Sequence, residues 1–354
     1  MAKELNSWFM PRTMLLNMKD ENKETPEIFI VTSNRTGGKT YGISKMLLED
    51  YFEKGEKFAL LTRWTKDLGN VANGIMDITI KDNFPDYELV EEVRMNGVYS
   101  QLFLTHKVTE KEVSKECCGY VLPINGSDNI KKISSVFYDV ETLFLDEFQA
   151  EKYCPNEVNK FTNLHFSIAR GGPNGVRYVK TILASNTLDI SNPYFDALGM
   201  SSKIQTDTKR YRGDGFVYYN YQNEVVANAQ KESAFNRAFA GNKQIQSNID
   251  NSWLNNSWIS VGKPDGTWGR GTYIFTIIDD DNKYGVMKYD NGYWFIGRKI
   301  DESCSNVYSM SVDGTENIEV ITRCLYLPTI SNAFMKGLVR FSDVAVKERV
   351  LSLI

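Results

Sequence analysis

A run of apolar, largely β-branched residues that passes directly into a lysine-bearing, glycine-rich turn is the feature that most constrains this fold. Residues 28–40 read IFIVTSNRTGGKT, one residue away from the pattern G-x-x-x-x-G-K-[ST]. In that pattern a strand enters a helix through a tight turn, and backbone N–H groups together with the helix dipole bind phosphate. The sequence therefore predicts a phosphate-binding loop made of Ser33, Asn34, Arg35, Thr36, Gly37, Gly38, Lys39 and Thr40.

The last two residues of the loop indicate its ligand. Lys39 would reach the β- and γ-phosphates of a nucleoside triphosphate, and the Thr40 hydroxyl would bind Mg²⁺. We therefore expect ATP and Mg²⁺ as cofactors. Ser33 stands where the pattern has its first glycine, so the backbone there must keep a negative φ. The alternative is a strand-to-helix turn that is rich in glycine and lysine but binds no nucleotide.

Composition narrows the class of protein. The chain has 354 residues, 42% of them hydrophobic and 24% charged, which is ordinary for a soluble protein and long enough for two domains. No apolar run approaches the ~20 residues that span a bilayer, and no secretory signal design is present, so we expect the protein to stay where it is made. The net charge of −4 argues against coating nucleic acid by bulk charge. Five cysteines without a C-x-x-C pair predict neither disulfides nor zinc.

The first 222 residues alternate strand-like and helix-like segments, which predicts an α/β domain with a mainly parallel sheet. A hairpin is expected around Asn96-Gly97, a pair that favours the type I′ turn. A helix should follow the loop from residue 39 to about 52, and another should begin at Pro155 and run to about 169. Strands are expected at 28–33, 58–62, 87–94, 98–105, 119–124, 141–148 and 178–186.

The rest of the chain divides by composition. Residues 223–250 are rich in Ala, Gln and Asn and predict a helical linker. Residues 251–354 predict a smaller α+β domain, in which Asp290-Asn291-Gly292 marks a hairpin. Its strands are expected at 272–278, 285–289, 293–300 and 318–326, and its helices at 331–340 and 343–353.

A second acidic motif gives the loop a chemical partner. Leu143-Phe144-Leu145-Asp146-Glu147 ends an apolar strand, where Asp146 can hold Mg²⁺ and Glu147 can act as the general base for water. In ATPases of this class another strand lies between the loop strand and the acidic strand. Residues 178–186 could supply it, and Ser185 and Asn186 would then sense the γ-phosphate. The alternative is a solvated Asp-Glu turn.

Charge that develops on the γ-phosphoryl group during hydrolysis calls for an arginine. Arg35 lies inside the loop and could act in cis. Arg170 ends the second predicted helix and precedes Gly171-Gly172-Pro173, an exposed corner that could reach a neighbouring subunit. An ordinary surface ion pair is the alternative for both.

Taken together, these motifs resemble those of the genome-packaging ATPases of small, protein-primed, short-tailed bacteriophages of the phi-twenty-nine type, compact relatives of large terminases. The similarity covers most of the chain. Several of its segments, NPYF and AFMKGLVRF especially, have no catalytic meaning of their own, which disfavours convergence. The matching segments are NRTGGKTYG (34–42), FPDYELV (84–90), DEF (146–148), PNEV (155–158), Asn163-Leu164, Arg170, SN (185–186), NPYF (192–195), NVY (306–308) and AFMKGLVRF (333–341).

The resemblance implies an ASCE-type P-loop NTPase domain followed by a domain that resembles an RNase H-like nuclease without its metal site. Lys39 and Thr40 would bind MgATP, Asp146 and Glu147 would drive hydrolysis, and Arg170 would act across the subunit interface. Trans-acting lysines of the family fall near Lys131 and Lys132, and basic residues facing the DNA channel fall near Arg63 and Lys66.

The same resemblance implies the biological setting. The protein would package double-stranded DNA into a preformed capsid as a homopentameric ring on the portal protein, with a packaging RNA as a further candidate partner and no membrane. It would act in the cytoplasm of the infected bacterial host, transiently at the portal vertex.

Two other functions remain open from the residues alone. One is another ring P-loop ATPase, such as a helicase; the other is an adaptor that binds nucleotide and DNA without hydrolysis. Nuclease activity is not expected, because the acidic run Asp279-Asp280-Asp281 falls between two strands, where a solvated turn is the simpler interpretation. Arg298, Lys299, Lys336 and Arg340 are instead candidate cations for DNA, portal or RNA.

Overall fold

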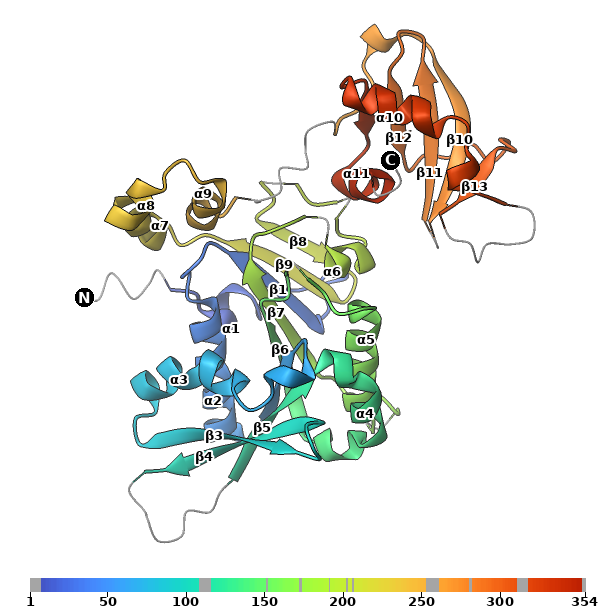
Figure 1. Cartoon of the computed structure of the whole chain (residues 1–354). Helices are drawn as coiled ribbons and strands as arrows, with labels where there is room; N and C mark the ends of the chain where they lie inside the picture. Colours follow the sequence, from blue (N-terminus) through green and yellow to red (C-terminus); the bar gives the residue numbers. More distant parts are fainter. Residues whose placement is uncertain are drawn as a thin grey trace. The chain divides into compact units, whose positions relative to one another are not determined.

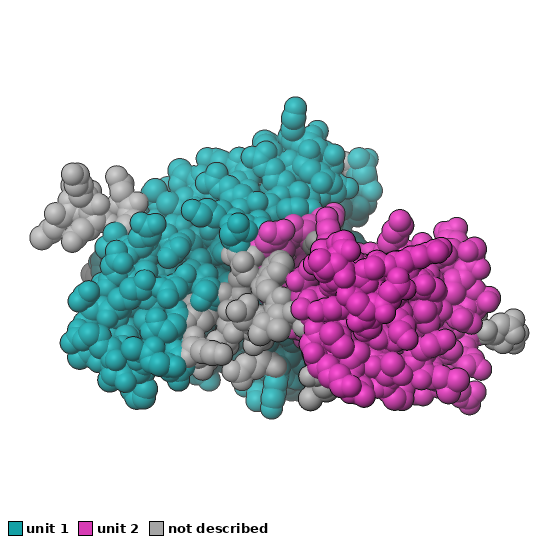
Figure 2. Space-filling model, turned by 90° about the horizontal axis from the view of Figure 1, so that it is seen from above, with its two compact units in different colours: residues 1–189, 206–254 teal, residues 190–205, 255–354 magenta. Residues whose placement is uncertain are grey.

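Two compact units make up the chain (Figure 2), one from residues 1–189 and 206–254, the other from 190–205 and 255–354. Each has its own sheet and hydrophobic core. The division at residues 222 and 250 stays a prediction. In the part of the chain that is described, no helix is both long and apolar enough to cross a membrane. The computed structural model describes residues 8–107, 116–150, 152–171, 174–190, 192–201, 203–205, 207–252, 261–279, 282–310 and 318–351.

A nine-stranded sheet organises the first unit, in the order β3-β4-β5-β2-β6-β7-β1-β9-β8. The six neighbouring strands β5-β2-β6-β7-β1-β9 run parallel, and an antiparallel pairing stands at each edge, β4 with β3 and β5 on one side and β8 with β9 on the other. This confirms the predicted α/β fold with a mainly parallel sheet. The strands are β1 Ile28–Ser33, β2 Lys57–Thr62, β3 Tyr87–Arg94, β4 Tyr99–His106, β5 Glu116–Pro123, β6 Val140–Asp146, β7 Lys180–Asn186, β8 Arg210–Gly213 and β9 Phe216–Tyr221.

Helices cover both faces of this sheet, with α1 to α3 on one face and α4 and α5 on the other (Figure 1). β1 lies between β7 and β9, which explains its continuous apolar run, since both of its faces are buried. α2 ends at Gly55 with φ 72°, the left-handed cap that glycine adopts without strain. The helices are α1 Pro11–Met14, α2 Lys39–Lys54, α3 Val71–Asn83, α4 Ser127–Lys132, α5 Glu157–Ile168, α7 Glu224–Glu232, α8 Ala234–Ala238 and α9 Lys243–Asp250.

The strand order positions the site. β7 lies between β6 and β1, as predicted, and Ser33 at the end of β1 pairs in register with Asn186 at the end of β7. Because these strands are parallel, their carboxyl ends meet at one edge of the sheet, where α/β proteins bind ligands.

The second unit is built on a six-stranded mixed sheet, in the order β14-β13-β10-β11-β12-β15. Strands β10, β11 and β12 form an antiparallel meander, and β13 and β14 extend it in parallel with β10. Trp294, Phe275 and Phe341 fill its core. The elements are α6 Pro193–Ala197, β10 Gly271–Asp279, β11 Asn282–Tyr289, β12 Trp294–Gly297, β13 Val307–Ser309, β14 Glu319–Val320, α10 Leu327–Met335, β15 Val339–Phe341 and α11 Val344–Leu351.

The structure corrects three predicted elements. Only Glu319–Val320 of the predicted strand 318–326 is extended, because a 3₁₀ turn follows and Pro328 starts α10 in its first turn, where proline is favoured. The predicted helix 331–340 stops early, since Gly337 with φ 72° reverses the chain into β15. α5 begins at Glu157 rather than at Pro155, because Asn156 adopts φ 55°.

Candidate nucleotide site

The loop between β1 and α2 has the geometry that the sequence predicts. Gly38 caps α2 with φ 85°, a conformation that favours glycine. Ser33 ends β1 without a positive φ, and its Oγ donates to the Asn34 carbonyl at 2.8 Å. A Cβ on Gly37 would lie 2.7 Å from the Ser33 Oγ. The serine is therefore compatible with the loop because Gly37 leaves room for its hydroxyl.

Lys39 is held at the centre of the site. Its Nζ donates to Ser33 Oγ at 2.6 Å and to Asn186 Oδ1 at 3.3 Å, and the residue is only 6% exposed. Burial lowers the pKa of Lys39 to about 8, although the carboxylates of Glu147 and Asp146 act in the opposite direction. Among the described residues no carboxylate bonds to this buried cation, which is therefore poised to bind an anion.

Thr40 and Asp146 converge on one point. The Thr40 hydroxyl donates to Asp146 Oδ2 at 2.8 Å, although the two residues are 106 positions apart. Burial raises the pKa of Asp146, while the Thr40 hydroxyl and Lys39 lower it. A hydroxyl beside a carboxylate is the oxygen pair that Mg²⁺ takes from a protein when phosphates and water complete its shell.

Glu147 follows Asp146 in a strained conformation. Its φ is 53°, which is uncommon for a residue other than glycine and clusters at functional sites. Glu147 is exposed at the sheet edge, yet desolvation by the surrounding protein raises the pKa of its carboxyl. Asp146 acts in the same direction, and Lys39 and Arg35 oppose it. A carboxylate with a raised pKa beside the phosphate loop is suited to take a proton from water.

The other residues predicted for the loop side lie in different surroundings. Arg35 is exposed and lies within electrostatic range of Glu147. Asn186 contacts Lys39 through its side chain, the position from which a phosphate would be sensed. Ser185 is fully buried and donates to the Asn186 carbonyl at 2.9 Å. The structure therefore brings Asn186, but not the Ser185 hydroxyl, to the lysine.

Arg63 is engaged by groups of its own unit, and its predicted contact with DNA stays a prediction. Its guanidinium is 3.1 Å from Glu157, and the two side chains are 12% and 1% exposed. It also donates to the carbonyls of Glu147 and Phe148 and lies over the Tyr153 ring. A desolvated ion pair of this kind leaves little of the arginine's charge for a DNA phosphate. The geometry therefore indicates that Arg63 positions the chain around Glu147, the expected general base. The sequence alone does not distinguish this buried, positioning arginine from an exposed cation.

Lys66 differs from Arg63. It lies in the 3₁₀ turn Thr65–Asp67 and is exposed. Asn125 holds this turn through the Thr65 N–H and hydroxyl, both at 2.9 Å. An exposed lysine on a fixed turn remains compatible with a phosphate contact.

A cavity of about 350 Å³ lies beside the carboxylates. It lies at the ends of β2 and β6 and beside α3, and its lining includes Arg63, Trp64, Asp146 and Glu147. The space on this side of Glu147 is large enough for water or for a side chain that enters from outside.

Exposed cations gather on the α4 and α5 side of the first unit. Arg170 follows the end of α5 and is exposed, and its backbone pairs with Val176 in an isolated bridge. Lys131 and Lys132 end α4 and are exposed as well. Gly172 and Pro173, part of the predicted corner, lie outside the described residues. The structure does not bring Arg170, Lys131 or Lys132 to the loop of their own chain through any contact among the described residues.

The predicted linker makes contacts with the loop that sequence reasoning missed. The Asn34 side chain donates to the Asn223 carbonyl at 3.2 Å and accepts from the Asn223 N–H at 3.0 Å. Gln230 on α7 donates to the Thr36 hydroxyl at 3.0 Å. Thr36 itself has φ 66°, unusual for a β-branched residue. The start and end of α7 are therefore fastened to the phosphate loop.

Comparison with known proteins agrees with this geometry. Residues 10–353 match the family model described as Podovirus DNA encapsidation protein (Gp16). The DNA packaging protein of Bacillus phage phi29 is 25% identical over 324 residues, covering 88% of each chain, and that of Bacillus phage B103 is 24% identical over 316 residues, covering 86% of this chain and 89% of the relative.

Solved structures show the same fold. A chain of the bacteriophage Phi-29 viral genome packaging motor assembly superposes with a TM-score of 0.68 at 20% identity, covering 98% of both chains. The Phi-28 gp11 DNA packaging motor gives a TM-score of 0.58 at 17% identity, covering 96% of this chain and 95% of that one. With its family match spanning nearly the whole sequence, this chain belongs to the Podovirus DNA encapsidation protein (Gp16) family.

Proposed function

We propose that this protein is an ATP-driven translocase that packages double-stranded viral DNA into a preformed capsid. The observation that carries the proposal is the convergence of Lys39, Thr40, Asp146 and Glu147 at one edge of the sheet, with Thr40 and Asp146 2.8 Å apart. The DNA substrate is inferred from family membership, and the binding of a triphosphate is inferred from the geometry of the site. Together they support hydrolysis coupled to movement on duplex DNA.

Each group of the site has a distinct part in this proposal. The N–H groups of the loop and the Lys39 ammonium bind the phosphates, and Thr40 and Asp146 hold Mg²⁺, which shields the phosphate charge when bound. Glu147 takes the proton of the attacking water. Arg35 lies close enough to Glu147 to influence it electrostatically and is the candidate for charge stabilisation in cis.

The active assembly is proposed to be a homopentameric ring on the portal protein. The exposed Arg170, Lys131 and Lys132 would face the site of the neighbouring subunit, and Lys66 would contact DNA phosphates without reading sequence. A packaging RNA is a further candidate partner. The ring would form in the cytoplasm of the infected bacterium, at the portal vertex.

The second unit is proposed to bind rather than cleave nucleic acid. Asp279, the described residue of the acidic run, is 6% exposed and lies 3.5 Å from Arg349 and 3.4 Å from the Tyr284 hydroxyl. Asp280 and Asp281 lie outside the described residues. Arg298 pairs with Asp343 and Arg340 donates to the carbonyls of Gly337 and Val339, so the exposed Lys299 and Lys336 are the better candidates for a partner's phosphates.

Two competing functions predict different behaviour. A helicase of the same class would separate the strands of a forked duplex, whereas a packaging motor moves on duplex without separating it. An adaptor that only binds nucleotide would show no turnover that depends on Glu147. The raised pKa of Glu147 beside the loop favours hydrolysis over simple binding.

The Glu147→Gln substitution tests the proposal. We expect it to leave MgATP binding within about twofold of wild type and to lower turnover by at least the ~10²–10⁴-fold that a general base supplies. Glu141→Gln is the matched control, because Glu141 lies at the other end of β6 and should leave both values unchanged. Normal turnover in the Glu147→Gln protein would sink the assignment of the base.

A further inference from the structure

An indole ring lies directly against the phosphate loop. A Cβ built on Gly38 would come within 2.7 Å of Trp8 Cε3 and 3.4 Å of Cζ3, so the ring contacts the residue that precedes Lys39. Trp8 is nevertheless 42% exposed. One part of the ring therefore packs on the loop, and the rest remains accessible to a ligand.

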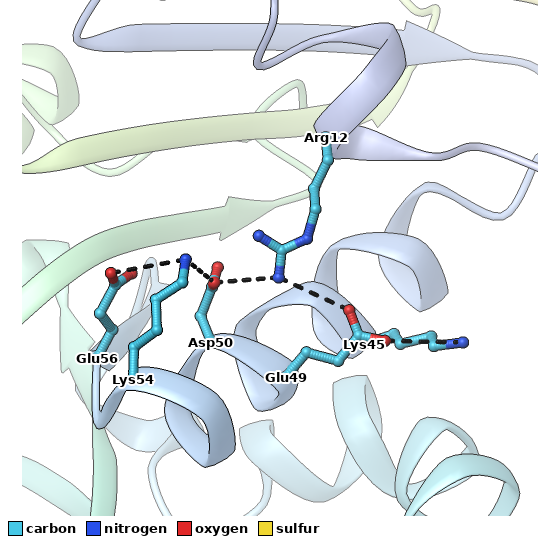
Figure 3. A network of polar contacts seen from close by, with 6 residues as sticks. All are labelled: Arg12, Lys45, Glu49, Asp50, Lys54 and Glu56. Atoms are coloured by element: carbon cyan, nitrogen blue, oxygen red, sulfur yellow. Dashed lines mark hydrogen bonds and ion pairs between the residues drawn. The ribbon is translucent and has the colours of Figure 1, made fainter.

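The segment that carries Trp8 is fixed along α2. Phe9 is 2% exposed and its ring lies 5.5 Å from that of Tyr221, and its carbonyl lies so close to Gly42 that a Cβ there would be 2.4 Å away. Arg12 donates to the buried Asp50 at 3.0 Å and lies 3.7 Å from Glu49 (Figure 3). These anchors hold the indole at the first turn of the helix.

Stereochemistry brings the nucleoside to the same place. Phosphates bound by the N–H groups of Gly37 to Thr40 leave the nucleoside at the start of α2, outside the loop. Tyr41, another aromatic residue there, is tied toward α3, because its hydroxyl accepts from Asn83 at 2.8 Å. Among the residues that the structure describes at this helix start, Trp8 is the aromatic side chain that combines contact with the loop and a large exposed area.

We propose that Trp8 is the stacking platform for the base of the nucleoside triphosphate, an inference that rests on the proposed nucleotide site. A flat indole and a flat base attract each other through their π-faces and exclude water from both. Such stacking tolerates any base, because every base has a π-face. Trp8 therefore contributes affinity for the nucleoside, and it does not select adenine over guanine.

Titration calorimetry of the full-length protein with Mg²⁺ can separate the base from the phosphates. ATP and inorganic tripolyphosphate are titrated into wild type, Trp8→Leu and Trp8→Phe. Loss of one stacked ring is worth ~5- to 150-fold in affinity, so Trp8→Leu should weaken ATP binding by that factor and leave tripolyphosphate binding within about twofold. Trp8→Phe should recover most of the ATP affinity, since a ring is present. Tyr138→Leu, at an aromatic residue that is 71% exposed and has no contact with the loop, should change neither constant.

Each contrary result has its own meaning. Equal weakening of ATP and tripolyphosphate by Trp8→Leu would show that the indole only shapes the loop, and unchanged ATP affinity would show that the base lies elsewhere; either result overturns the stacking role. Wild-type protein that bound neither compound would overturn the nucleotide site, and the inference with it. Quenching of indole fluorescence by ATP in wild type, lost in Trp8→Phe, would support the stack.

Discussion

The residues of the site are coupled through their charges. Lys39 is buried next to two carboxyl groups whose pKa values are both raised, and Lys39 has a neutral partner in Ser33 at 2.6 Å. Thr36 and Glu147 on either side of it have positive φ angles, which cost about 1–3 kcal/mol each and persist where surrounding structure fixes them. The fold therefore holds desolvated charges and strained backbone in position around Lys39, and MgATP would bring phosphate to the lysine and Mg²⁺ to Asp146.

The lowered pKa of Lys39 predicts a pH dependence of nucleotide binding. The phosphates need the charged lysine, and its pKa in the ligand-free protein is about 8. Below that pH the lysine is charged and affinity should be flat; above it a proton must be taken up, so affinity should fall up to tenfold per pH unit. For folding the sign is opposite, because the cost of the buried charge is present below pH 8 and fades as pH rises toward 10.5, so stability should increase over that range.

Measured MgATP dissociation constants between pH 7 and 10 check this dependence. Lys81→Gln, which removes an exposed lysine of α3, should keep the wild-type profile. A wild-type affinity that stays constant over the whole range would contradict the lowered pKa.

At the scale of elements, one buried ion pair joins three of them. Arg63 follows β2, Glu157 begins α5, and the carbonyls of Glu147 and Phe148 follow β6; the arginine binds all three. Glu157 also accepts from the Cys154 N–H at 2.8 Å. The pair thus fixes the segment that carries the base relative to the helix that leads to Arg170.

Breaking this pair should destabilise the protein. Arg63→Ala leaves Glu157 buried without its cation, which costs about 3–5 kcal/mol, whereas Lys66→Ala should change stability by less than about 0.5 kcal/mol. Urea unfolding of both variants measures the difference. If Arg63→Ala were as stable as wild type and instead reduced the salt dependence of DNA binding, Arg63 would be a DNA contact after all.

Elements also show what the sequence can predict. The phosphate loop and the Asp146-Glu147 end of β6 were predictable, because each signal lies within a few consecutive residues and follows an apolar strand. The contacts Arg63 to Glu157, Asn34 to Asn223 and Gln230 to Thr36 join residues 94, 189 and 194 positions apart. No local pattern encodes such pairs, since they depend on how the strands and α7 are placed in space. β8 and β9 are not predicted as strands for a similar reason, because β9 is placed by its pairing with the distant β1, and β8 by its pairing with β9.

For the whole molecule, the first unit presents two different faces. The loop, Glu147 and the cavity open at one edge of the sheet, while Arg170, Lys131 and Lys132 are exposed with α4 and α5. A head-to-tail contact between copies joins unlike faces and closes into a ring when the rotation allows it. The proposed ring would then complete each site with an arginine from the next subunit.

Mixing subunits tests whether Arg170 acts across such an interface. Arg170→Ala and Glu147→Gln subunits, each inactive alone, should regain ATP turnover when mixed at concentrations where rings form. A Glu147→Gln subunit would lend its arginine, which accelerates a site by ~10³–10⁵-fold, to the intact Glu147 of a neighbouring Arg170→Ala subunit. Arg210→Ala, at an exposed arginine of β8, should be active without a partner variant. Mixtures that stay inactive would contradict the trans role.

If hydrolysis at this site drives movement on duplex DNA, as proposed, the rate of ATP hydrolysis must differ with and without double-stranded DNA. We expect duplex to stimulate the wild-type rate, in the presence of portal-bearing capsids if the ring forms only there, and to leave a forked duplex unseparated. Glu147→Gln should show no stimulated rate. A wild-type protein that binds ATP yet hydrolyses none under these conditions would contradict the proposed translocase. So would a wild-type rate of ATP hydrolysis that does not change when duplex DNA is added.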